Sequence, residues 1–222
     1  MKKNRAGGEA RSRIAESTVR RLSLYLRFLQ EAQAAGDTTI SSEELAERGG
    51  TTSAQVRKDL SFFGSFGKRG LGYSVPELLR ALEEILGLDR TWNVALVGAG
   101  KIGSALISYR NFQRRGFRIR AVFDTDPEKI GTRWGSQPIL SDDEMEAVLA
   151  RESIEIAIVA VPADAAQPVV DRLVNAGVRA ILNFAPVRLR VPDDVALRNV
   201  DMVVEMEGLS FALNSSKLGA RS

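Results

Sequence analysis

An apolar run is followed at once by three glycines spaced as G-x-G-x-x-G, namely Gly98, Gly100 and Gly103. In this motif the first glycine permits a sharp turn, the second lets the backbone approach a pyrophosphate, and the third lets a helix pack on the strand. The first N–H groups of that helix would face the phosphates. The motif therefore indicates a dinucleotide site, the alternative being a plain glycine-rich turn. The expected cofactor-binding residues of this loop are Gly98, Ala99, Gly100, Lys101, Ile102 and Gly103.

A carboxylate follows the next apolar run. Asp124 lies 21 residues beyond Gly103, where an acidic side chain is expected to hydrogen-bond the adenosine ribose. A negative charge there would repel the 2′-phosphate of NADP, so NAD(H) is the expected cofactor. The Lys101 side chain could face the phosphates or simply be solvated, and the sequence leaves both readings open.

Basic and amide side chains gather between residues 53 and 69. Arg57 and Lys58 lie near the start of an expected short helix, where arginine can pair bidentately with guanine and lysine acts as a point charge. Lys68 and Arg69 lie in a glycine-rich segment and suit the minor groove or the phosphate backbone. Taken singly, each charge could be a solvated surface residue. The expected DNA-binding residues are Ser53, Gln55, Arg57, Lys58, Lys68 and Arg69.

The elements expected around these residues form a winged helix. Helical periodicity begins at Ser17 and ends near Gly36. Two capping boxes, Ser41 with Glu44 and Thr52 with Gln55, then open two short helices that are separated by paired glycines. Residues 63–73 alternate glycine with aromatic side chains and predict a β-hairpin wing. A further helix over residues 76–87, opened by a third box of Ser74 with Glu77, connects to the rest of the chain.

From residue 92 onward the pattern changes to strands alternating with helices. Buried strands are expected over residues 93–97, 119–123, 155–161 and 178–184, and helices over 142–150 and 165–176. This alternation predicts an α/β fold with a doubly wound parallel sheet, a Rossmann domain. The expected division is a disordered tail (1–12), a winged-helix domain with its connecting helix (13–87), a Rossmann NAD(H)-binding domain (88–206) and a C-terminal helix (207–222).

Composition narrows the function. The 222 residues include no cysteine and no histidine, which excludes disulfides and thiolate metal sites and makes catalysis less favoured. No metal site is expected. Residues 1–75 hold 13 Lys and Arg against 8 Asp and Glu, whereas the remainder holds 18 against 20, so a polyanion would suit the first part. No segment predicts a membrane span or a secretory signal, and we expect a cytoplasmic protein.

Taken together, these features resemble the Rex family of redox-sensing transcriptional repressors along essentially the whole chain. The resemblance is carried by VRKDLSFFG (56–64), GKRGLGY (67–73), GAGKIG (98–103), FDTDP (123–127) and ILNFAP (181–186). It implies a homodimer, not an enzyme, that binds a palindromic operator when NADH is scarce and leaves the DNA when NADH binds.

The same resemblance implies roles for residues outside the two sites. Residues 209–218 would form a C-terminal helix exchanged between subunits, although a self-packed helix fits the pattern equally well. Tyr109 matches a position near the nicotinamide, or it is a packed aromatic residue. Arg27 and Asp201 match positions of an inter-subunit ion pair that takes part in switching. Lys101 stands where some relatives have arginine.

Two other function classes remain open from the residues alone. An NAD-dependent dehydrogenase with a regulatory DNA-binding domain would need a proton donor beside the nicotinamide, and no clear constellation supplies one. A regulator that senses another nucleotide, such as coenzyme A, is the third reading, and Asp124 argues mildly against it.

Overall fold

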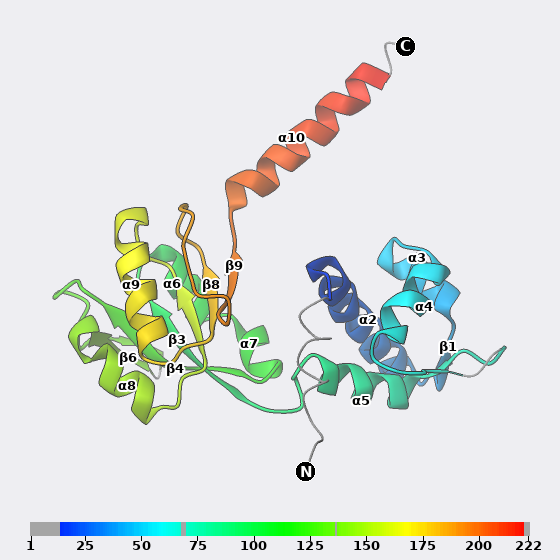
Figure 1. The fold of residues 1–222 in the computed structure, drawn as a ribbon, viewed down its shortest axis with the longest axis horizontal. Helices are drawn as coiled ribbons and strands as arrows, with labels where there is room; N and C mark the ends of the chain where they lie inside the picture. Colours follow the sequence, from blue (N-terminus) through cyan, green and yellow to red (C-terminus); the bar gives the residue numbers. More distant parts are fainter. Residues whose placement is uncertain (1–13, 68–69, 136, 220–222) are drawn as a thin grey trace. The chain divides into compact units, whose positions relative to one another are not determined.

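The computed structural model describes residues 14–67, 70–135 and 137–219, so the expected tail and the pair Lys68-Arg69 lie outside the described residues. The chain separates into two units, Met1–Arg90 and Thr91–Ser222, which are described in turn (Figure 1). The expected fold class, an N-terminal DNA-binding domain followed by a Rossmann-type α/β domain, is confirmed.

The N-terminal unit is built from helices around one apolar core. Its elements are α2 (Glu16–Ala35), β1 (Thr39–Ile40), α3 (Ser42–Gly49), α4 (Ser53–Ser61), β2 (Tyr73–Ser74) and α5 (Val75–Ile85). The core gathers Leu22, Leu26 and Leu29 of α2 with leucines and valines of the other three helices. Helices α3 and α4 form the expected helix-turn-helix, and Gly50 between them adopts the left-handed conformation that the tight turn requires.

The capping signals are only partly confirmed. Ser41 and Glu44 form a complete box, because the Ser41 side chain accepts from the Glu44 N–H and the Glu44 carboxylate accepts from the Ser41 N–H. Thr52 accepts from the Gln55 N–H at 3.1 Å, but the Gln55 side chain turns to Asp59 instead of back to Thr52. Ser74 makes no capping hydrogen bond to α5, so the third expected box is wrong.

The expected wing differs from a regular β-hairpin. Residues 63–67 form no strand, and β2 pairs with β1 instead, in antiparallel register with Ile40 opposite Tyr73. The reason lies in the backbone, because Gly64 and Gly67 both adopt positive φ (147° and 82°), which interrupts an extended strand.

The second unit is a Rossmann-type sheet. Its strands are β3 (Trp92–Val97), β4 (Phe117–Asp124), β5 (Arg133–Trp134), β6 (Gln137–Ser141), β7 (Ile156–Val159), β8 (Ala180–Asn183) and β9 (Ala196–Asn199). They lie in the order β5-β6-β4-β3-β7-β8-β9, parallel except for the β5–β6 pair. The chain runs from β3 to β4 on one side and returns to β7 on the other, so the topological switch point lies between β3 and β7.

Helices cover both faces of this sheet. The apolar side chains of α6 (Lys101–Ile107) and α7 (Arg110–Arg114) pack with Val94 and Leu96 of β3 on one face. Helices α8 (Met145–Arg151), preceded by the short helix η1 (Asp142–Glu144), and α9 (Ala163–Asn175) pack with Ala95 and Val97 on the other. The four strands predicted from the sequence are present; the short strands β5, β6 and β9 were not predicted.

The last helix, α10 (Met202–Gly219), begins seven residues before the expected 209–218 segment. Asp201 explains the early start, because its carboxylate accepts the N–H groups of Val203 at 2.9 Å and Val204 at 3.3 Å and so caps the first turn. The expected boundary at residue 206 therefore falls inside the helix. Across the described ranges, none of the helices has the length and apolar content to cross a bilayer.

Candidate functional site

The glycine loop lies at the switch point, between the end of β3 and the start of α6. Gly98 has φ +102°, and a Cβ atom there would collide with the Ala160 carbonyl oxygen in the loop after β7. A Cβ atom at Gly103 would collide with the Gly98 carbonyl oxygen. Both positions therefore require glycine for the fold itself, as the close contact between helix, turn and neighbouring strand demands.

Gly100 differs from the other two glycines. Its φ of −91° suits any residue, and no atom lies within 4 Å of the position that its Cβ would take. The space beside this backbone is open. The hydrogen bonds of α6 begin with the Ser104 N–H donating to the Gly100 carbonyl at 2.9 Å, so the earlier N–H groups have no partner within the helix. An open backbone with such N–H groups fits a pyrophosphate.

The other residues of the loop divide into buried and exposed. Ala99 is buried, whereas Lys101 and Ile102 are exposed at the start of α6. An exposed lysine agrees with either reading of Lys101, solvated or facing phosphates.

Asp124 packs against the glycine loop. Its side chain is 10% exposed, and its two oxygens accept the N–H groups of Ala99 at 2.7 Å and Asp126 at 2.9 Å. A carboxylate offers about four acceptor sites, two on each oxygen. Oδ2 also accepts from Lys129 Nζ at 3.4 Å, so Oδ1 is the oxygen that keeps a site for another donor such as a ribose hydroxyl. The position at the end of β4 agrees with the ribose-binding role expected for Asp124.

A cavity of about 360 Å³ opens beside Gly98, Gly100 and Asp124. Its walls come from the ends of β3 and β4, the loop after β7 and the first turns of α9. Most of the lining is apolar, and the size falls in the range of small-ligand sites. The apolar lining residues are Val97, Ala160, Val161, Pro162, Ala165 and Val169.

Lys129 is a member of this cavity that the sequence reasoning missed. Its Nζ lies 3.4 Å from Asp124 Oδ2 and 3.1 Å from Asp126 Oδ2. The hydrogen bond with Asp126 and the nearby charge of Asp124 raise the pKa of Lys129 above its ordinary value despite partial desolvation. Asp124 and Asp126 of the FDTDP segment thus have a cation beside them. The sequence signal that could have identified Lys129 is a lysine two residues after Pro127.

Tyr109 lies apart from the cavity in the single chain. It precedes α7, is 52% exposed, and accepts a hydrogen bond from the Asn111 amide at 3.1 Å. Its ring meets Phe112 edge-on at 5.2 Å, and both line a second hollow with Trp134. The residues lining that hollow do not include Gly98 or Gly100, so in the single chain Tyr109 and these two glycines line separate hollows.

The candidate DNA-reading side chains on α4 differ in how far they are exposed to solvent. Arg57 and Lys58 are exposed, and Ser53 and Gln55 are half-buried. The Gln55 amide donates to Asp59 Oδ1 at 2.8 Å, which directs the NH₂ group of Gln55 inward.

Asp59 anchors α4 to α2, a role that the sequence reasoning did not assign. Its buried carboxylate accepts from Arg21 Nε at 2.6 Å, Arg21 Nη2 at 2.8 Å and the Tyr25 hydroxyl at 3.1 Å. Burial alone would raise the pKa of Asp59, but these bonds and the one from Gln55 outweigh it and hold the pKa below its ordinary value. Burial and the Asp59 charge raise the pKa of Tyr25 to about 12. The network fixes the orientation of α4.

This network predicts an acid-sensitive N-terminal unit. Because the pKa of Asp59 is lowered by folding, its stabilising contribution is present above about pH 3.9 and is lost as the pH falls through the folded pKa. Thermal unfolding of the natural protein and of Asp59→Asn should therefore differ most at neutral pH and converge in acid. A difference in Tm that stays constant from neutral pH to about pH 3 would contradict the role of Asp59.

The two expected switch residues belong to different units. Arg27 is exposed on α2, and Asp201 is exposed while its carboxylate caps α10. An inter-subunit pair between them stays a prediction.

Each of the two units is similar to a known protein family. A family model described as "Putative DNA-binding protein N-terminus" matches residues 13–61, and one described as "CoA binding domain" matches residues 89–187. A redox-sensing transcriptional repressor Rex from Carboxydothermus hydrogenoformans is 52% identical over 199 residues, which cover 90% of this chain and 96% of that protein.

Solved structures agree over nearly the full length. The structure of RSP in complex with β-NAD⁺ and operator DNA matches with a TM-score of 0.88 at 40% identity, covering 94% of this chain and 96% of that one. The structure of RSP in complex with β-NADH matches with a TM-score of 0.85 at 39% identity, covering 94% and 98%.

A helix-turn-helix unit joined to a Rossmann unit with an open glycine loop defines a ligand-responsive transcription regulator. The chain belongs to the Rex family of redox-sensing transcriptional repressors. The expectation of a regulator instead of an enzyme is confirmed by these relatives, and the dehydrogenase reading is set aside.

Proposed function

We propose that this protein represses transcription by binding an inverted-repeat operator when the NADH/NAD⁺ ratio is low, and that binding of NADH releases it. The observation that carries the proposal is the open backbone at Gly100 beside Asp124, in a chain whose first unit presents Arg57 and Lys58 on a helix-turn-helix. The same chain thus holds a place for the dinucleotide and a surface for DNA.

The DNA-binding half of the proposal rests on α4. A recognition helix meets base edges and phosphates with the residues near its start. We assign base reading to Arg57, and phosphate contact to Lys58 and Ser53. Lys68 and Arg69 stay in the proposed interface on sequence grounds alone. RSP, which was solved with operator DNA, supports this half.

The dinucleotide-binding half rests on the glycine loop and its cavity. The loop from Gly98 to Gly103 would hold the pyrophosphate, Asp124 the ribose, and the apolar cavity the adenine. The bound nicotinamide supplies the redox signal, since its two forms differ by one ring charge and in planarity. Tyr109 remains the proposed contact of that ring. RSP, which was solved with β-NADH and with β-NAD⁺, supports NAD(H) as the cofactor.

We further propose a homodimer in the cytoplasm whose subunits exchange α10. Seven apolar side chains of this helix are between 57% and 72% exposed in the single chain, which is more than a monomer normally leaves in water. They are Met202, Val203, Val204, Met206, Leu209, Phe211 and Leu213. A dimer also supplies the symmetry that an inverted repeat requires, and an ion pair between Arg27 and Asp201 of opposite subunits would orient the DNA-binding units.

The deciding experiment measures DNA binding with and without the cofactor. A labelled duplex, selected by the protein from a random-sequence library, is titrated at a stated salt concentration and followed by fluorescence anisotropy. NADH is expected to weaken binding, whereas NAD⁺ at the same concentration weakens it less, because only a difference in affinity for the two states shifts their populations. Coenzyme A is the control ligand, since one matching model is named for it. Equal effects of NADH and NAD⁺, or release by coenzyme A, would refute the proposal.

Cofactor choice gives a second prediction. Asp124→Asn should reduce the preference for NADH over NADPH by roughly tenfold or more, because the charge that repels a 2′-phosphate is removed. Lys129→Met should change the preference in the opposite direction, because its ammonium lies 3.4 Å from Asp124. Both affinities are measured by titrating the nucleotide fluorescence. Glu128→Gln, an exposed neighbour outside the cavity lining, is the control and should leave the ratio unchanged.

A further inference from the structure

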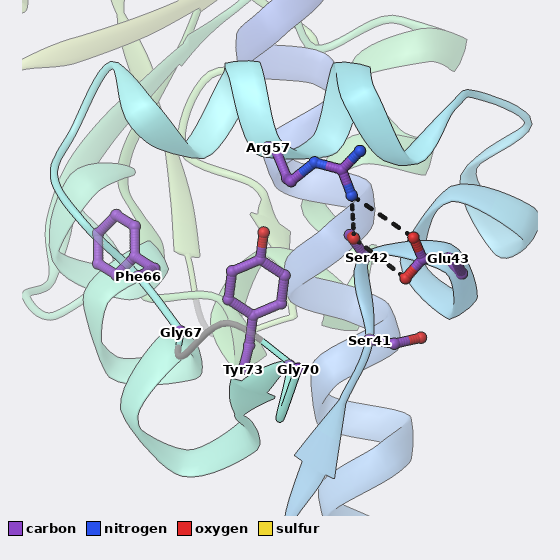
Figure 2. Close-up of a pocket in the computed structure, with 9 residues that line it drawn as sticks. Ser41, Ser42, Glu43, Arg57, Phe66, Gly67, Gly70 and Tyr73 are labelled. Carbon is purple, nitrogen blue, oxygen red and sulfur yellow. Dashed lines mark hydrogen bonds and ion pairs between the residues drawn. The ribbon is translucent and has the colours of Figure 1, made fainter.

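The guanidinium of Arg57 is already engaged inside the N-terminal unit. Its Nη1 donates to Ser42 Oγ at 2.9 Å and lies 3.5 Å from Glu43 Oε1. Ser42 Oγ in turn donates to Glu43 Oε2 at 3.1 Å, which closes a small network between α3 and α4 (Figure 2). The arginine that is proposed to read DNA therefore has partners before DNA arrives.

Both partners are held in place. Ser42 is buried and cannot move away without disturbing the start of α3. Glu43 lies in the first turn of the same helix, where the hydrogen bond from its own N–H, the Ser42 hydroxyl and the Arg57 charge hold its pKa below the ordinary value. Glu43 is consequently charged at neutral pH, although its side chain is 69% exposed.

The network lies on the rim of a hollow of about 560 Å³. The hollow is lined by the start of α3, by Arg57, by Phe66 and Gly67 of the segment that precedes β2, and by Tyr73 of β2 itself (Figure 2). These are the elements with which a winged helix approaches DNA. On bound DNA, a carboxylate at this place would face the phosphates, and in the free protein it pairs with the arginine that could bind them.

We propose that Glu43 is a specificity-determining residue for DNA recognition. By binding Arg57 through charge, it keeps this side chain from adding affinity at sequences that offer only phosphates. The inference rests on the proposed function, in which Arg57 contacts the operator.

Arg57 would exchange Glu43 for a different partner at each kind of DNA sequence. At a non-operator sequence, Arg57 would exchange one anionic oxygen of Glu43 for one anionic oxygen of a phosphate. This exchange adds little to the free energy of DNA binding. At the operator it would trade Glu43 for a bidentate pair with a guanine, whose fork geometry a single carboxylate contact at 3.5 Å does not match. Glu43 thus weakens non-operator binding more than operator binding and raises their ratio.

The test is Glu43→Gln, which keeps the shape and removes the charge. Affinities are measured for the selected operator duplex and for a duplex of the same composition in shuffled order. Since exposed ion pairs are weak, affinity for the shuffled duplex should rise about two- to five-fold, and affinity for the operator less. Glu47→Gln, an exposed acid on the same helix, controls for the loss of one negative charge and should leave the ratio unchanged.

A second experiment tests whether Glu43 acts through Arg57. In Arg57→Ala, the change Glu43→Gln should no longer alter the ratio of operator to shuffled affinity. An equal rise on both duplexes, a persistent effect in the Arg57→Ala background, or weaker operator binding by Glu43→Gln would each overturn the inference. Failure of the unmodified protein to select any duplex, or to release it with NADH, would instead refute the proposed function.

Discussion

Replacement of Gly100 by leucine is expected to give a protein that binds operator DNA but no longer responds to NADH. The new side chain meets no atom of the folded chain within 4 Å of its Cβ, and φ at this position suits leucine. The Rossmann unit should therefore fold normally. The side chain would fill the space in which the backbone must approach the pyrophosphate.

The expected loss is large because the phosphate contacts are charge-assisted. Each hydrogen bond to a charged group contributes about 1.5–3 kcal/mol, so loss of two lowers NADH affinity by roughly 100-fold or more. NADH titration by fluorescence measures the affinity, and anisotropy of the operator duplex with and without NADH measures the response.

Two comparisons make the result specific to this site. Ala147→Leu adds similar bulk to an exposed position on α8, outside the cavity lining, and should leave NADH binding unchanged. Gly98→Ala should instead destabilise the whole unit, because its Cβ meets the backbone of Ala160. An NADH affinity of Gly100→Leu equal to that of the natural protein would refute the assignment of the loop.

The sequence predicted those features whose signals are local. Runs of apolar residues located β3, β4, β7 and β8, and the capping box at Ser41 marked the start of α3. The glycine spacing predicted the turn at the switch point, because the first glycine of the motif permits a sharp turn and the third permits close packing of the helix, as Gly98 and Gly103 show.

The features that were missed depend on contacts between residues distant in the chain. Arg57 meets Ser42 across 15 positions and Asp59 meets Arg21 across 38, and no periodicity encodes such pairs. The Gln55 side chain was expected to complete a capping box with Thr52. Instead, its amide donates to the buried carboxylate of Asp59, one turn later in α4. Strand β6 escaped prediction since Pro138 interrupts its pattern.

The start of α10 was missed for a different reason. The expectation followed the apolar residues after Leu209, whereas the local signal was polar: Asp201, a favoured N-cap residue, directly before Met202 and Val203. An acidic residue that the resemblance assigned to switching thus also ends the preceding loop. The two roles are compatible, because one oxygen accepts the backbone N–H groups and the other remains available.

Replacement of Arg57 by alanine is expected to give the opposite phenotype to Gly100→Leu, with NADH binding intact and operator binding lost. A bidentate arginine–guanine pair contributes about 1–3 kcal/mol of discrimination, and a symmetric dimer would lose it in both half-sites. Operator affinity should therefore fall by at least roughly tenfold, while affinity for the shuffled duplex changes little.

Lys58→Ala is the matched control for this experiment. Lys58 is exposed on the same helix. If it contacts phosphate in both half-sites, its loss should weaken binding to both duplexes about equally and lower the salt dependence of binding by about two units of slope, one for each subunit. Arg57→Ala should leave that slope almost unchanged, because its ion pair with Glu43 keeps it from phosphates in the natural protein. A uniform loss of affinity in Arg57→Ala, with a lower slope, would show that Arg57 acts as a phosphate contact and not as the reader of a base.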